Sequence, residues 1–156
     1  MAKRNRDGLT MSSITHILAA TDFSHDANRA VTLAAALARA LSAKLTLLHV
    51  VQTPAYAFLG GGAYVASPEL VDDIMAEAKR WLAAAKDRLG DLDVGTVCLE
   101  GDPATLIVRW AEEHGPGMIV VGTHGRRGVR RALLGSVAEH VVRSAPCPVT
   151  TVRAQD

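Results

Sequence analysis

The chain has 156 residues, of which 49% are hydrophobic and 21% are charged, a composition typical of one globular domain with a sizeable core. Its 17 Lys and Arg residues nearly balance 16 Asp and Glu residues, and it holds only two each of Phe, Tyr and Trp. Nucleic-acid binding is not expected, because it usually requires a basic excess or stacking aromatic side chains. The two cysteines, Cys98 and Cys147, are too few for a disulfide framework or a zinc site.

Residues 1–13 are polar and basic and lack the apolar stretch of a secretory signal. We therefore expect a flexible extension ahead of a single domain at residues 14–153. No run of 18 apolar residues occurs, which predicts no membrane span and a cytoplasmic protein.

Short apolar runs and amphipathic segments alternate along the chain. A nearly continuous apolar run at residues 14–20 predicts a strand that is covered on both faces. Ser24 is a candidate cap for a helix that extends to Leu41, because apolar residues recur there with the 3.6-residue period. Residues 44–51 predict a second buried strand.

Residues 53–66 interrupt this alternation. Three consecutive glycines at 60–62 predict an irregular, mobile loop. Ser67 and Pro68 then begin a helix that ends at Gly90. One apolar stripe of this helix is expected to face the core: Leu70, Val71, Ile74, Ala78, Trp81, Leu82, Ala85 and Leu89.

The second half of the chain repeats the alternation. Strands are predicted at residues 94–99, 118–121 and 148–152, and helices at 103–114 and 136–143. Gly95 in the third strand and Pro148 at the start of the fifth indicate that these two are edge strands.

Strands separated by helices predict an α/β fold with a five-stranded parallel sheet, strand order 3-2-1-4-5 and helices on both faces, as in Rossmann-like proteins. In such sheets a ligand binds outside the carboxyl ends of the strands, where the strand order reverses. Here the reversal lies between the first and fourth strands. It brings together Thr21-Asp22 and residues 122–125.

The segment after the fourth strand is rich in glycine and arginine, with Ser136 opening the last helix. Glycines let main-chain amides approach an anion, a helix N-terminus adds a partial positive charge, and arginines add cations. These features suit a triphosphate, but composition alone equally fits a tight connection with solvated arginines. The residues concerned are Gly122, Gly125, Gly128, Gly135, Arg126, Arg127, Arg130 and Arg131.

The spacing Gly122-x2-Gly125-x9-Gly135-Ser136 resembles that of the ATP-binding branch of the universal stress protein (UspA) family. The resemblance extends from residue 14 to residue 153 through the motifs ILAATDFS, LLHV, EGDP and GSVAEHVVRSAPCPV. It implies a five-stranded sheet like that of adenine nucleotide alpha hydrolases. It also implies bound ATP, with Mg²⁺ or Mn²⁺ bridging the phosphates, in a nucleotide-responsive signalling or stress-response module.

The resemblance implies a role for each matching position at the nucleoside end. The main chain of Val50 would read the adenine edge, and Ala20 and Thr21 would wall the base pocket. Asp22 would hold the nucleoside, with Gly122 beside the ribose. From its place after a strand alone, Asp22 could equally ligate a metal or cap the first helix.

At the phosphate end the resemblance implies a cradle made of Gly125, Gly135, Ser136 and Val137. Val121, His124 and Arg126 complete the expected nucleotide-binding set. No acid or nucleophile is spaced to support catalysis by His124, so we expect no catalytic residue and at most slow ATP hydrolysis. His49 is predicted to be a hydrogen-bonded core histidine.

Members of this family tend to dimerise through the last strand, which here is the predicted open edge at residues 148–152. The chain departs from the family pattern at Gly117, where an acidic residue is frequent, and at Ala138, where some relatives carry a hydroxyl. Two other classes stay open: a partner-binding scaffold of the same fold that binds no nucleotide, and a true hydrolase or nucleotidyl transferase.

Overall fold

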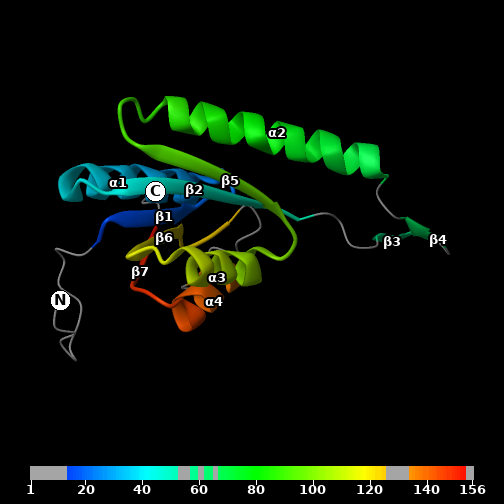
Figure 1. Cartoon of the computed structure of the whole chain (residues 1–156). Coiled ribbons are helices and arrows are strands. Elements are labelled where there is room, and N and C mark those ends of the chain that lie inside the picture. The colour runs from blue at the N-terminus through cyan, green and yellow to red at the C-terminus, as the bar shows by residue number, and fades with distance from the viewer. Residues whose placement is uncertain (1–13, 53–56, 60–61, 65–66, 126–133, 154–156) are drawn as a thin grey trace.

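The structure, a computed structural model, describes residues 14–52, 57–59, 62–64, 67–125 and 134–153 (Figure 1). Its elements in chain order are β1 (His16–Ala20), α1 (His25–Leu41), β2 (Lys44–Val51), β3 (Ala57–Leu59), β4 (Gly62–Tyr64), α2 (Pro68–Asp87), β5 (Val94–Glu100), α3 (Pro103–His114), β6 (Met118–Gly122), α4 (Ser136–Ser144) and β7 (Val149–Val152). The predicted extension at 1–13 lies outside the described residues.

Five strands form one parallel sheet in the order β5-β2-β1-β6-β7. This confirms the predicted order 3-2-1-4-5, with β5 and β7 at the edges. The strand order reverses between β1 and β6, so the carboxyl ends of these two strands mark the expected crevice.

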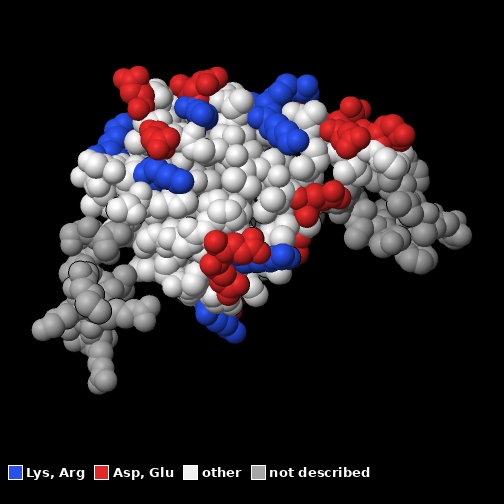
Figure 2. All heavy atoms as spheres, in the orientation of Figure 1, with Lys and Arg blue, Asp and Glu red and all other residues white. Residues whose placement is uncertain are grey.

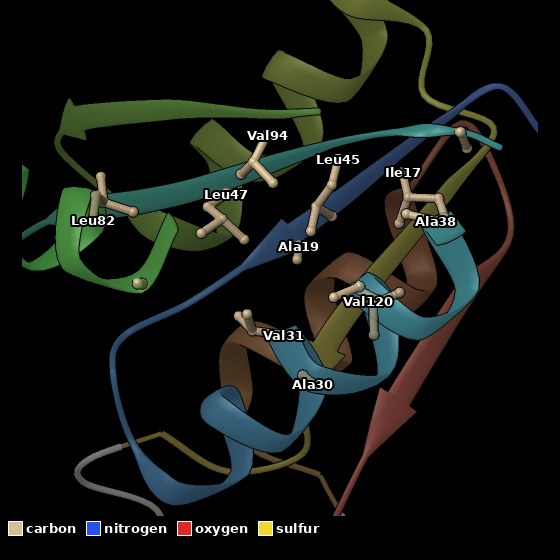
Figure 3. Close-up of a cluster of buried hydrophobic side chains, with 14 of the residues drawn as sticks. Ile17, Ala19, Ala30, Val31, Ala38, Leu45, Leu47, Leu82, Val94 and Val120 are labelled. Carbon is tan, nitrogen blue, oxygen red and sulfur yellow. The ribbon is translucent and has the colours of Figure 1, made fainter. Parts of the chain in front are cut away.

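Helices cover both faces of the sheet, α1 and α2 on one side and α3 and α4 on the other (Figure 1). Figure 3 shows the core under α1 and α2, where Ile17, Ala19, Leu45, Leu47 and Val120 from the sheet meet small side chains of α1. Alanines dominate that helix face, so α1 lies close to the strands. The opposite core contains Leu18, Leu48, Ile119 and the aromatic ring of Trp110 on α3.

Side chains cap three of the helices at the residues that the sequence indicates. The Ser24 and Ser67 hydroxyls accept the amides of Ala27 and Leu70, each at 3.3 Å, to start α1 and α2. The Asp102 carboxylate accepts the Thr105 amide at 2.8 Å to start α3. At α4 the cap residue is Gly135, and no side chain of the described residues caps that helix.

Two predictions about residues 53–66 and the following helix are wrong. Residues 57–59 and 62–64 pair as a short antiparallel hairpin, in which Leu59 opposes Gly62. Gly62, one of the three consecutive glycines, is itself a paired strand residue, so part of this segment is regular. In α2 only Ala78, Leu82 and Ala85 of the predicted stripe are buried, and Leu70 and Trp81 are each 42% exposed.

No helix in the described part of the chain is long and apolar enough to cross a bilayer. On the face shown in Figure 2, acidic and basic side chains are interspersed, and acidic groups gather over the N-terminal end of α2.

Candidate functional site

The turn that joins β1 to α1 is held by hydrogen bonds from three directions. The Thr21 carbonyl accepts His49 Nδ1 at 2.7 Å, and the Thr21 hydroxyl accepts the Phe23 amide at 3.0 Å. One oxygen of Asp22 accepts the Ser24 amide at 3.0 Å. These bonds stabilise Phe23 in the left-handed region at φ 63°, which a non-glycine residue rarely adopts. Asp22 is thereby fixed at the crevice, and the predicted hydrogen bond of His49 is confirmed.

The main chain of Val50 faces the crevice beyond the end of β1. The ladder between β1 and β2 ends at the pair Ala20–Leu48, with one further bond from the Thr21 amide to the Leu48 carbonyl. Main-chain groups alternate between the two sides of a strand, and the Val51 carbonyl bonds to Gly101 on the β5 side. The amide and carbonyl of Val50 therefore point toward the β1 side, where no strand residue follows Ala20.

Three of the predicted site residues lie in the core near the carboxyl ends of their strands. Ala20, Val50 and Val121 are buried and belong to the core cluster on the α3 and α4 side of the sheet. Val137 packs against the same cluster at the start of α4. All four side chains are apolar, so the core below these strand ends carries no charge of theirs.

Each of three site glycines lies where a side chain would collide. A Cβ on Gly122 would lie 2.8 Å from the Ala27 amide nitrogen, so this glycine lets the first turn of α1 pack on β6. A Cβ on Gly125 would lie 2.7 Å from the second oxygen of Asp22. A Cβ on Gly135 would lie 3.2 Å from the Thr123 carbonyl oxygen.

In one respect the start of α4 differs from the phosphate cradle that the resemblance implies. The Gly135 amide donates to the Thr123 carbonyl at 2.7 Å and is occupied inside the protein. The amides of Ser136, Val137 and Ala138 open the helix, where an α-helix leaves its N–H groups without intrahelical partners. Ser136 is exposed, so the donor end of α4 is accessible.

The acid that faces His124 was not expected from the sequence. Asp26 Oδ2 accepts the Thr123 hydroxyl at 2.8 Å and the His124 amide at 3.1 Å, and it lies 3.3 Å from His124 Nδ1. The expectation that no acid supports His124 is therefore wrong. The two residues lie 98 positions apart and are brought together by the packing of α1 on β6.

Several predicted site residues lie outside the described residues: Arg126, Arg127, Gly128, Arg130 and Arg131. Among the described residues no group of three or more His, Cys, Asp or Glu side chains could hold a metal ion. A shallow hollow lined by Arg39 and residues 88–92 lies where α1 and α2 end, at the other edge of the sheet.

Gly117 shows why the acidic residue frequent in the resembled family is missing. A Cβ at this position would lie 3.1 Å from the Ile14 Cα and 3.3 Å from its side chain. The Gly117 amide also donates to the His16 carbonyl at 2.9 Å. A larger residue would require Ile14 to shift by a few tenths of an ångström, and the departure lies at the amino end of β6, away from the carboxyl ends of the strands.

Together these features define a doubly wound α/β protein whose sheet reverses its strand order between β1 and β6, the place where such folds bind ligands. A family model described as the universal stress protein family matches residues 13–153. The chain belongs to the universal stress protein family.

Individual relatives agree with this assignment. Universal stress protein YxiE of Bacillus subtilis is 35% identical over 146 residues, which cover 88% of this chain and 97% of that protein. The solved structure of UspA from Lactobacillus plantarum is similar with a TM-score of 0.77 at 30% identity, and the match covers 90% of this chain and 98% of that one. A universal stress protein in complex with cAMP is similar with a TM-score of 0.68 at 26% identity, covering 90% and 98%.

Proposed function

We propose that this protein binds ATP in the crevice between the carboxyl ends of β1, β2 and β6. Three features beside the strand order reversal carry the proposal. They are the Val50 amide and carbonyl, which point toward the β1 side beyond the end of β1, the hydrogen-bonded turn at Asp22, and the start of α4, which no side chain of the described residues caps. In this arrangement the adenine edge bonds to Val50 and its ring lies against Ala20 and Val121. The solved relative in complex with cAMP supports an adenine nucleotide as the ligand.

The phosphates extend from Asp22 toward α4 in this proposal. The amides of Ser136 and Val137 and the Ser136 hydroxyl donate to phosphate oxygens, favoured by the partial positive charge of the helix N-terminus. Gly125 is exposed, and the Asp22 carboxylate lies directly beside it, 2.7 Å from where a Cβ would stand. Arg126 would add a cation. Mg²⁺ or Mn²⁺ would be held largely by phosphate oxygens and water.

Signalling suits this site better than rapid turnover. Asp26 on α1 already bonds to His124 at the end of β6, so we assign both residues to structure rather than to proton transfer. Hydrolysis would be slow at most, with the cation stabilising the leaving phosphate. We therefore propose a cytoplasmic, nucleotide-responsive stress-response module that acts as a homodimer through β7.

Substitution of Ser136 tests the phosphate donors without breaking the helix. Ser136 is the first residue of α4, where proline is favoured, and Gly135 at φ −73° and ψ 161° has the extended conformation that a following proline requires. Ser136→Pro removes the amide and the hydroxyl, whereas Ser136→Ala removes only the hydroxyl. We expect titration calorimetry to show that Ser136→Pro weakens MgATP binding by more than about tenfold.

Ser136→Ala should weaken binding less than Ser136→Pro does, because it keeps the amide. Adenosine, which has no phosphate, should bind both variants as it binds the wild type. The proposal fails if the wild type gives no heat with MgATP and no competition by ADP or AMP. An unchanged MgATP affinity in Ser136→Pro would show that the phosphates do not lie at α4.

A further inference from the structure

Asp26 links the first turn of α1 to a segment almost a hundred residues away. One of its oxygens accepts two hydrogen bonds, from the Thr123 hydroxyl at 2.8 Å and the His124 amide at 3.1 Å. The His124 ring nitrogen Nδ1 lies 3.3 Å from the same oxygen and 3.0 Å from the Thr123 hydroxyl. The side chains of Asp26 and His124 are each only 14% exposed, so water competes little with these contacts.

The backbone geometry leaves Asp26 little freedom to move away. At Gly122 the end of β6 approaches α1 so closely that a Cβ would lie 2.9 Å from the Asp26 carbonyl carbon. The main chain of Asp26 therefore packs closely on β6, while its carboxylate accepts the His124 amide. The carboxylate is consequently held at the root of the β6–α4 connection.

The bonds continue from this root to the start of α4. The Thr123 carbonyl accepts the Gly135 amide at 2.7 Å, and Gly135 is the cap residue of the helix. The Thr123 amide donates to the Val152 carbonyl at 2.9 Å, and the Ser24 hydroxyl lies 3.4 Å from the His124 carbonyl. The peptide between Thr123 and His124 is thus held by Asp26 of α1 on its amide side and by Gly135 at the start of α4 on its carbonyl side, and β7 holds the preceding peptide.

We propose that Asp26 is a positioning residue for the phosphate end of the site. It orients the Thr123–His124 peptide, and through the Thr123 carbonyl it sets where the donor end of α4 faces the crevice, without itself touching the ligand. The inference rests on the proposed function. The nucleoside end does not depend on Asp26, because Val50 and Asp22 are held by bonds of β2 and of the β1–α1 turn.

A purely structural role for Asp26 has different consequences. An acid in the first turn also stabilises α1 through the helix dipole, and its loss would then lower stability without discriminating between ligands. Glu69 occupies the matching place in the first turn of α2, is exposed, and is far from residues 122–125 in the fold. Glu69→Ala is therefore a matched control for Asp26→Ala.

The experiment compares MgATP and adenosine binding by titration calorimetry in wild type, Asp26→Ala, Asp26→Asn and Glu69→Ala. We expect Asp26→Ala to weaken MgATP by about tenfold and adenosine by less than about threefold, because it loses two hydrogen bonds that hold the connection. Asp26→Asn keeps an oxygen that can accept both bonds and should restore MgATP affinity to within about threefold of the wild type. Glu69→Ala should bind both ligands normally.

A second measurement needs no ligand. Amide ¹H–¹⁵N shifts of residues 135–138 should change in Asp26→Ala and not in Glu69→Ala. Unchanged shifts, or equal losses of MgATP and adenosine affinity, would overturn the positioning role. Wild-type protein that binds neither ligand would overturn the proposed function itself. Wild-type binding together with normal MgATP binding by Asp26→Ala would overturn this inference alone.

Discussion

His16 at the start of β1 is a titratable side chain in a partly buried setting. Its Nε2 lies 2.9 Å from the Thr46 hydroxyl, and its ring meets the Trp110 indole edge-on with centroids 5.8 Å apart. The ring of His114 stacks parallel to the Trp110 indole. Burial first, and then the charges of Lys44 and His114, lower the pKa of His16 from its usual value of 6.5.

This pKa shift predicts that stability falls in mild acid. Below about pH 6.5 the unfolded chain binds a proton at His16 that the folded protein resists, so the contribution is complete above that pH and declines as the pH drops toward the lowered folded value. Urea midpoints should therefore fall from about pH 7.5 to about pH 5.5, and His16→Gln should reduce the fall. The same substitution at the exposed His25 is the control. An equal fall in His16→Gln and wild type would contradict the assignment.

At the residue scale, helix-capping hydrogen bonds were predictable because they join residues that are close together in the sequence. Ser24 and Ser67 were recognisable from their sequence context as helix caps, and each accepts the amide of the residue three positions later. The bond between Asp26 and Thr123 was not, because it spans 97 residues and depends on how closely α1 packs on β6. The missing side chain of Gly122 permits that close packing, and the place beside the ribose that the resemblance implies for this residue stays a prediction.

Periodicity predicted which residues of α2 share a face but not how far the sheet extends beneath them. Ala78, Leu82 and Ala85 are buried, whereas Leu70, earlier on the same stripe, is exposed. Figure 1 shows the N-terminal end of α2 extending past the sheet toward the hairpin of β3 and β4. Apolar residues that recur every 3.6 positions identify one face of a helix, but they do not indicate how wide the sheet beneath that helix is.

The orientation of β7 predicts which of its residues would join two copies of the chain. The carbonyls of Pro148 and Val152 bond to β6, so by alternation the main chain of Thr151 points away from the sheet. Thr151→Pro should therefore remove an outward donor, keep the pairing with β6, and convert a dimer to a monomer. Light scattering after gel filtration measures this. A wild-type monomer, or a Thr151→Pro dimer, would contradict dimerisation through β7.

Over the whole molecule, the strand order and the point where it reverses were predictable because alternating strands and helices leave few right-handed topologies. The occupied amide of Gly135 was not, because it depends on the path of the chain between β6 and α4. The departure at Gly117 has a packing cause at the far end of β6 and leaves the crevice unaffected.

Amide ¹H–¹⁵N shifts followed during a titration with MgATP would most directly reveal where a polyphosphate sits on this protein. If MgATP binds as proposed, we expect saturable changes at Ser136 and Val137 together with Val50, and smaller changes at the first two when adenosine replaces MgATP. Changes confined to other regions, or none at any concentration, would contradict the proposed binding site.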